Sequence, residues 1–319
     1  MTADRDESIR ADPGLTDDAR GAAGAETRSG RDATVASVVE VADYLWPFHT
    51  QENWDASELV VGRPEATVRR ILVAVDPVSS VVQEAVDLRA DLLLTHHPLM
   101  LGGQSSVAAD HYKGRFVHEL IENRIGLLAC HTNADSAASG VSEVLIQACG
   151  VTDSRPLQPL AEDSSVGLGR IGTLDQPVTL EDLARRLAAV VPPTAQGVRV
   201  AGAKDREIHT VAVCGGAGGS LLDAVAATEA DVYVTADLRH HPVSEAREAA
   251  MHGDDDGLCL IDLSHAASEW LWAPVGAAAL EAALRECGHD VEVLVSTRRT
   301  DPWDFRVPSP HPEPQDRWN

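Results

Sequence analysis

Apolar residues recur along this chain at two periods, one typical of buried strands and one typical of helices. Short apolar runs bounded by polar residues predict strands buried on both faces, as in a parallel sheet covered by helices. Apolar residues three and four apart predict helices. The predicted strands are 70–75, 92–95, 126–130, 167–174, 211–213, 231–235, 257–262 and 290–296. The predicted helices are 35–46, 81–90, one ending at 123, 141–149, 180–190 and 264–286, the last interrupted at Pro274.

Capping residues and composition divide this pattern into segments. Thr34 and Thr179 stand where helix N-caps are expected. Residues 1–33 have almost no large apolar side chain, so burial cannot offset the entropy cost of ordering them. Pro156 and Pro159 mark a linker. The expected divisions are a disordered extension (1–33), an N-terminal α/β lobe (34–150), a linker (151–165), a C-terminal α/β lobe (166–305) and a loose tail (306–319).

A weak internal repeat relates the two lobes. The first copy is Val73-Ala-Val75, a helical segment, and Ala90-Asp91 followed by three apolar residues and Thr95. The second copy is Val211-Ala-Val213, a helical segment and Ala230-Asp231-Val-Tyr-Val-Thr235. A duplicated βαβ unit explains this match, and two unrelated units with common strand composition are the alternative. The predicted fold class is therefore α/β, with two lobes of mixed sheets related by a weak internal duplication.

Composition and charge indicate the cellular compartment and exclude some classes of binding partner. The chain has 319 residues, of which 44% are hydrophobic, enough for two lobes with a sizeable core. A formal net charge of −24 argues against nucleic acid and anionic membranes as partners. The five cysteines are odd in number and form no CxxC motif, which indicates a reduced, cytoplasmic protein. No apolar run approaches the ~18 residues of a membrane span, and no signal-peptide core is present.

Side chains that can bind metal follow four of the predicted strands. His96 and His97 come first, and Pro98 places them at the end of their strand, because proline cannot continue a central strand. Ligands bind at such carboxyl ends in open α/β sheets. The other three groups are His131 with Asp135, then Asp237 with His240 and His241, then Asp262 with His265 and Glu269. His265 and Glu269, four residues apart, lie on one face of a helix.

Five of these donors suit a pair of divalent metal ions. They are the imidazoles of His96, His97 and His265 and the carboxylates of Asp135 and Glu269. Five protein ligands exceed what a three-ligand catalytic zinc site needs and are too few for two closed tetrahedral sites. They fit two metals ~3.5–4 Å apart, bridged by a carboxylate and completed by water. The donor set suits Zn, Fe, Mn, Co or Ni and does not choose among them.

These motifs resemble those of the GTP cyclohydrolase I type 2 homologue family, the Nif-three-like dinuclear-metal proteins. The resemblance runs from about Val35 to Phe305. It is carried, in order, by Glu52-Asn-Trp-Asp55, Val75-Asp-Pro77, Thr95-His-His-Pro98, His131-Thr-Asn-Ala-Asp135, Gly215-Gly-Ala-Gly-Gly-Ser220, Thr235-Ala-Asp237, and His265 with Glu269. In that family the metal ligands fall on the same five residues. The resemblance implies two α/β lobes flanking the metal pair, a toroidal homohexamer and a proposed hydrolysis of GTP.

Further candidates surround the predicted metal pair. Gly215, Gly216, Gly218 and Gly219 follow a strand and open a helix, so their N–H groups would suit a phosphate. A tight turn required by close packing explains the same glycines. Asp237 and His241 are candidate acid–base residues, or residues that orient a ligand by hydrogen bonding. His131 could likewise supply an acid–base or substrate contact, but orienting a ligand by hydrogen bonding is the preferred interpretation.

The predicted function is that of a metal-dependent hydrolase resembling GTP cyclohydrolase 1 type 2. Water activated by the metals would attack C8 of the purine, open the ring and release formate. Paired metals also stabilise displacement at phosphorus, so a metal-dependent phosphoesterase is one alternative. A non-catalytic metal-binding scaffold or adaptor is the other.

Overall fold

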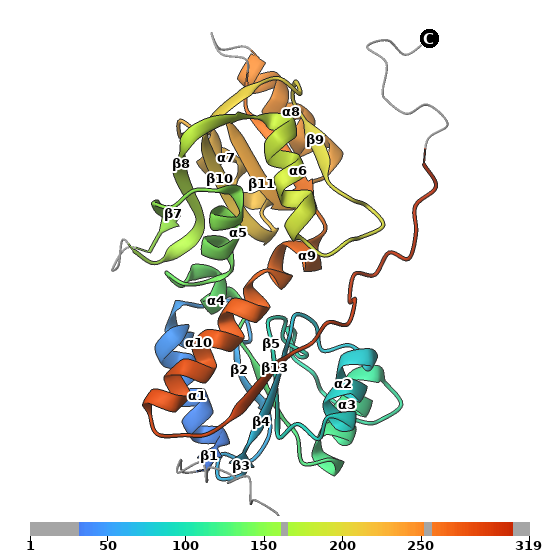
Figure 1. Cartoon of the computed structure of the whole chain (residues 1–319). Helices are drawn as coiled ribbons and strands as arrows, with labels where there is room; N and C mark the ends of the chain where they lie inside the picture. Colours follow the sequence, from blue (N-terminus) through green and yellow to red (C-terminus); the bar gives the residue numbers. More distant parts are fainter. Residues whose placement is uncertain (1–31, 161–164, 252–256, 309–319) are drawn as a thin grey trace, which may run out of the picture.

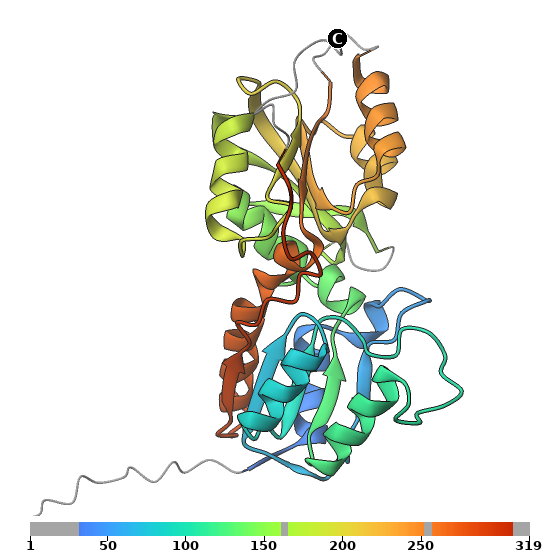
Figure 2. The same cartoon turned by 90° about the vertical axis from the view of Figure 1, so that its right-hand side faces the viewer.

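The computed structural model describes residues 32–160, 165–251 and 257–308. Figure 1 shows two α/β lobes stacked end to end, each built around a β-sheet, and Figure 2 shows the narrow waist between them. The extension and tail predicted from the sequence lie mostly outside the described residues. Of those segments the structure covers only 32–33 and 306–308.

The sheet of the N-terminal lobe has five strands in the order β13-β4-β5-β6-β2. Its strands are β2 (Glu58–Val61), β4 (Arg70–Ala74), β5 (Leu92–Thr95), β6 (Gly126–Ala129) and β13 (Glu292–Val295). Strands β13, β4, β5 and β6 run parallel, and β2 is an antiparallel edge. Every residue of β5 and β6 is buried, as their uninterrupted apolar runs predicted.

Helices cover both faces of this sheet. Ile71 and Val73 point to one face, under α1 (Val35–Leu45) and α10 (Trp272–Glu286). Leu72 and Ala74 alternate to the other face, under α2 (Ser79–Asp87) and α3 (Tyr112–Glu122). Thr34, at the end of β1 (Ala33–Thr34), which pairs antiparallel with β3 (Thr67–Val68), caps α1 as predicted.

The sheet of the C-terminal lobe has six strands in the order β7-β8-β10-β11-β12-β9. Its strands are β7 (Ser154–Pro159), β8 (Gly167–Thr179), β9 (Arg199–Ala201), β10 (Glu207–Ala217), β11 (Val232–Ala236) and β12 (Cys259–Leu263). One face is covered by α5 (Val141–Cys149) and α6 (Leu180–Val190), the other by α7 (Leu222–Ala226) and α8 (His240–Met251). Only β10, β11 and β12 pair in parallel.

The internal repeat is a true structural duplication. Strands β4-β5-β6 and β10-β11-β12 have the same order and direction. Asp91 accepts hydrogen bonds from the N–H groups of Arg69 and Arg70 at 2.8 and 3.0 Å. Asp231 accepts them from His209 and Thr210 at 2.7 and 2.8 Å. Matching contacts at matching positions favour duplication over chance similarity.

The structure corrects three details of the sequence prediction. The linker predicted at 151–165 contains strand β7, which tolerates Pro156 and Pro159 because it is a sheet edge. The last strand, β13, pairs with β4 and so belongs to the N-terminal sheet instead of the C-terminal lobe. The final helical stretch breaks at Leu271 and not at Pro274, because a proline in the first turn of α10 costs no helical hydrogen bond.

Three short helices lie near the junction of the lobes. They are η1 (Phe48–Thr50), α4 (Thr132–Ser136) and α9 (His265–Trp270), and η2 (Gly219–Leu221) precedes α7. The ring of Trp272, just after α9, is fully buried and packs edge-on against Trp46 of the N-terminal lobe, with centroids 5.0 Å apart. This contact supports packing as the role of Trp272.

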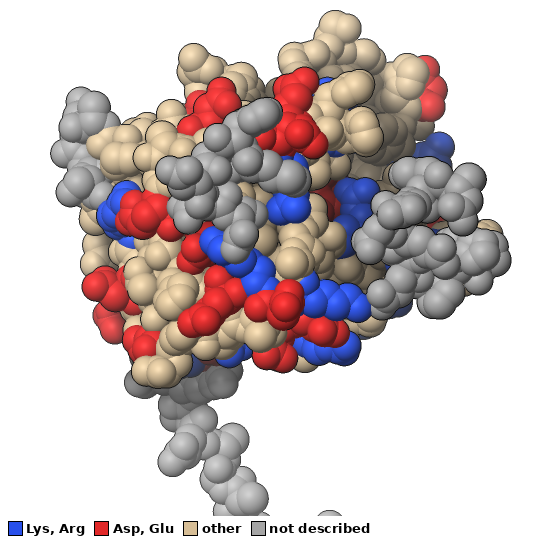
Figure 3. All heavy atoms as spheres, turned by 90° about the horizontal axis from the view of Figure 1, so that it is seen from above, with Lys and Arg blue, Asp and Glu red and all other residues tan. Residues whose placement is uncertain are grey.

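The structure bears on three features of the composition: the surface charges, the cysteines and the lack of a long apolar segment. Figure 3 views the C-terminal lobe from above and shows basic and acidic side chains interspersed over that face. All five cysteines are free, and burial raises the pKa of Cys130, Cys149 and Cys214 to about 12. Within the described ranges, no helix combines the length and apolar character needed to cross a membrane.

Candidate metal centre

Strand β5 delivers His96 and His97 to the junction of the lobes. The backbone stays hydrogen-bonded to the neighbouring strand segment beyond β5, with His96 N–H donating to Ala74 at 3.1 Å and His97 N–H to Val75 at 2.9 Å. The two side chains are then fixed separately. The Nδ1–H of His96 donates to the Cys130 carbonyl at 2.9 Å, and that of His97 to Asp76 at 2.7 Å. Each imidazole is thereby held with Nε2 as its free nitrogen.

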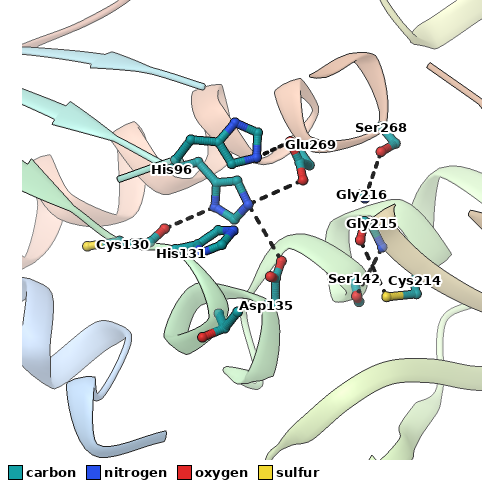
Figure 4. A network of polar contacts seen from close by, with 12 residues as sticks. His96, Cys130, His131, Asp135, Ser142, Cys214, Gly215, Gly216, Ser268 and Glu269 are labelled. Carbon is teal, nitrogen blue, oxygen red and sulfur yellow. Dashed lines mark hydrogen bonds and ion pairs between the residues drawn. The ribbon is translucent and has the colours of Figure 1, made fainter. Parts of the chain in front are cut away.

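Asp135 and the pair on α9 bring carboxylates to the same place. Asp135 lies in α4, directly after β6, and its Oδ1 is 3.8 Å from His96 Nε2. Glu269 Oε1 lies 3.4 Å from His96 Nε2 and 3.0 Å from His265 Nε2, and its Oε2 lies 3.2 Å from His97 Nε2. Figure 4 shows His96 facing both Asp135 and Glu269. The structure thus brings together all five residues singled out as metal ligands.

Several of these polar atoms lack a hydrogen-bond partner although they are buried. They are His96 Nε2, Asp135 Oδ1 and Glu269 Oε2. A buried polar atom without a partner is costly unless a ligand or ion satisfies it. His97 Nε2 and His265 Nε2 also face each other at 3.2 Å, as two nitrogens that share a cation do. Three imidazoles and two carboxylates aimed at one place fit a divalent metal.

The charges of the cluster are strongly coupled. Burial alone would raise the pKa of Glu269, but the surrounding imidazoles hold it well below the ordinary value. Burial would lower the pKa of His265, yet the Glu269 carboxylate raises it to about 9. Burial raises the pKa of Asp135. Glu269 is therefore an anion that positive charge beside it stabilises.

Outside the cluster, carboxylates orient the ligand imidazoles. Asp237, in a left-handed conformation with φ of 57°, accepts a hydrogen bond from His265 Nδ1–H at 2.7 Å. Asp55 does the same for His131 at 2.7 Å. Asp76, which the sequence reasoning missed as a site residue, serves His97 in the same way. The sequence feature that could have identified Asp76 is its place just after β4, the strand that pairs with β5.

His241 lies elsewhere. It is exposed in the first turn of α8, and its recorded ring contact among the described residues is with His240, at 5.2 Å between centroids. The Thr-His-His-Pro arrangement of the first repeat has four more residues inserted in the second, which moves the histidines away from the end of β11. An acid–base role for His241 stays a prediction without a contact to support it.

The glycine-rich loop packs against the metal cluster. The N–H groups of Gly215, Gly216 and Gly218 donate to the hydroxyls of Ser142, Ser268 and Thr235 at 3.3, 2.9 and 2.9 Å. These three donors are therefore satisfied within the protein, the first two as Figure 4 shows, and an added Cβ at Gly215, Gly216 or Gly218 would meet a neighbour at 2.2–2.5 Å. Phosphate binding by Gly215, Gly216, Gly218 and Gly219 stays a prediction that these contacts do not support.

Gly216 is where an added side chain would reach the cluster. A Cβ there would lie 2.4 Å from Glu269 Oε1 and 3.2 Å from His265 Nε2, at a φ of +65°. Gly216→Ala is expected to displace Glu269 and lose bound metal, beyond the ~1–2 kcal/mol that left-handed backbone costs any alanine. Gly197→Ala is the matched control, because Gly197 has a φ of +69° and nothing within 4 Å of its Cβ position. Equal metal content in the two variants would contradict this account.

The fold and the site together define a class: a two-lobed α/β protein with buried imidazole and carboxylate donors where the lobes meet. A family model for Duf34/NIF3 (NGG1p interacting factor 3) matches residues 33–302. The chain belongs to the DUF34/NIF3 family. Its cluster of candidate metal ligands lies within the matched range.

Similar proteins agree with this assignment. A Streptomyces coelicolor protein named GTP cyclohydrolase 1 type 2 homolog is 49% identical over 277 residues, which cover 86% of this chain and 95% of that protein. The protein of the same name from Mycobacterium tuberculosis is 33% identical, over 85% of this chain and 97% of its own. The crystal structure of Staphylococcus aureus hypothetical protein SA1388 superposes with a TM-score of 0.78 at 26% identity, covering 86% of this chain and all of that one.

Proposed function

We propose that this protein is a metal-dependent hydrolase whose site holds two divalent metal ions. The observation that carries the proposal is the convergence of buried, unpartnered donor atoms of His96, Asp135 and Glu269 from both lobes. When bound, a divalent pair supplies Lewis-acid activation of water and of the substrate atom under attack. Zn, Fe, Mn, Co and Ni all suit the donor set.

The residues of the site have two different roles: some would bind the metals, and others hold those ligands in position. Glu269 lies between the imidazoles of His96, His97 and His265, the position of a carboxylate that serves both metals. Asp76 and Asp237 hold the Nδ1 protons of His97 and His265, which keeps each Nε2 directed at the cluster. Substrate contacts must come from residues at the rim of the site, because these inner groups face the metals.

An exposed indole at the rim supports a planar heterocyclic substrate. Trp54 is 55% exposed, and its ring centroid lies 5.9 Å from that of His131. An indole face beside a metal centre is a stacking surface for a nucleobase. This favours GTP, with ring opening and release of formate, over a substrate that presents only a phosphoester. Two divalent metals would make the site itself locally positive, although the net charge of −24 would repel a nucleotide elsewhere on the surface.

The test combines metal analysis with two product assays. Protein purified without chelator is expected to contain about two divalent metals per chain and to release formate from GTP. Chelator-treated protein is expected to release none, and added metal is expected to restore activity. Free phosphate without formate would indicate a phosphoesterase instead. His97→Ala should abolish the activity, whereas His118→Ala, on the exposed surface of α3, should retain it.

A non-catalytic metal-binding scaffold is the second candidate, because side chains that can hold a metal ion need not present it to a substrate. Metal-loaded protein that leaves GTP and a panel of nucleotides and phosphoesters unchanged would favour the scaffold.

Assembly and location complete the proposal. We propose a homohexamer in the cytoplasm, with a nucleotide as the small-molecule partner. The free state of all five cysteines agrees with a reducing compartment. Native mass spectrometry of the metal-loaded protein tests the assembly.

A further inference from the structure

We infer that His131 is a sixth metal ligand, which binds the same ion as His96 and Asp135. This inference deepens the proposed function, because it rests on the metal centre proposed above and completes its first position. The sequence pattern alone made His131 an orienting residue. Three features of the structure assign it a direct role.

The first feature is the internal duplication. After β12, the third strand of the second repeat, come His265 and Glu269 at the start of α9. After β6, the third strand of the first repeat, come His131 and Asp135 at the start of α4. Both pairs are four residues apart, directly after equivalent parallel strands. His131 and Asp135 therefore occupy the same positions in the first repeat as His265 and Glu269 do in the second. Because the Nε2 of His265 points at the cluster, the equivalent place of His131 suits a metal ligand.

The second feature is the hydrogen bond that fixes the ring. His131 Nδ1–H donates to Asp55 at 2.7 Å, the length found for His97 with Asp76 and for His265 with Asp237. Metal-binding histidines almost always donate the other ring N–H to such an acceptor, which leaves a lone pair on the nitrogen that faces the metal. Asp55 is itself held by Thr132, whose N–H and hydroxyl both donate to it.

The third feature is position. The ligand atoms of His96, His97 and His131 all lie within 4.8 Å of one another. The His131 ring lies beside that of His96, with centroids 5.2 Å apart (Figure 4). Its centroid is 5.4 Å from that of His97. Its side chain is 13% exposed, on the side where Trp54 lies. An ion held by His96 and Asp135 therefore has a third donor within reach in His131, matching the three donors His97, His265 and Glu269 of the second position.

Proton NMR of the cobalt(II)-loaded, full-length protein counts the bound imidazoles. High-spin Co(II) shifts the N–H proton of each directly coordinated histidine far outside the ordinary range. All four Nδ1–H groups, of His96, His97, His131 and His265, donate to protein acceptors and so exchange slowly with water. Four shifted, exchangeable signals are expected. Three signals would overturn the inference.

The His131→Ala variant identifies the NMR signal of His131 and measures how much this residue contributes to metal affinity. His131→Ala is expected to remove one signal and to weaken binding of one ion per chain by more than ~100-fold, beyond the 10–100-fold that loss of an orienting partner costs. The second ion should remain, and the control His118→Ala should change neither measurement. Loss of no signal in His131→Ala would refute direct binding. Protein that takes up no cobalt at all would instead refute the metal centre itself, and both proposals with it.

Discussion

Glu269→Gln is expected to empty both positions of the proposed two-metal site. The carboxylate is 3% exposed and lies 3.0–3.4 Å from three imidazole nitrogens contributed by both lobes. Glutamine keeps the shape but removes the charge and leaves a poor ligand, so each ion loses a donor and the site loses charge balance. We expect affinity to fall by more than ~100-fold at both positions, because even an orienting partner is worth 10–100-fold. Titration calorimetry with Zn²⁺ and metal analysis measure the effect.

The control for this prediction is Glu281→Gln. The Glu281 side chain, on α10, is 39% exposed and pairs with Arg285 one turn away at 3.2 Å. Its loss should leave the metal content unchanged. A Glu269→Gln protein that still binds one ion with native affinity would show that the carboxylate serves a single position, and would remove the bridging role.

Arg170→Met is expected to cause a large loss of stability. Its guanidinium is buried and donates to the carbonyls of Gly167 and Gly169 at 2.7 and 2.8 Å, and to Ala137 at 2.5 Å. It also pairs with Glu143 at 3.2 Å. Methionine fills much of the volume but leaves these acceptors unpaired. Removing one partner of a buried ion pair costs about 3–5 kcal/mol, which denaturant-induced unfolding measures.

Arg185→Met is the matched control for that substitution. Arg185 on α6 pairs with Glu181 one turn away, but its side chain is 74% exposed. Exposed pairs contribute about 0–1 kcal/mol, so this variant should unfold close to wild type. Because Ala137 lies two residues after Asp135, Arg170→Met should also loosen α4 and reduce metal binding. Stability losses of similar size in the two variants would show that the buried guanidinium has no special role.

Comparison of the site with the sequence shows why some site residues could be predicted and others could not. His96, His97 and Asp135 could be found because they end apolar strands, and His265 with Glu269 because of helical spacing. Asp76 was missed as the partner of His97: its place just after a strand was a signal, but the hydrogen bond joins residues 21 apart and could not be predicted from it. His241 had the right motif, but a four-residue insertion moves it off the strand end.

By itself the sequence determined the class of fold, the parallel core strands and the five side chains with metal-binding chemistry. Those follow from local rules: apolar runs bury, caps start helices, and imidazole and carboxylate bind cations wherever they are. Only the tertiary structure decided that β13 joins the first sheet, that Pro156 and Pro159 sit in an edge strand, and that the glycine loop packs against Glu269. These features depend on contacts between residues far apart in the chain, whose free energy no local pattern records.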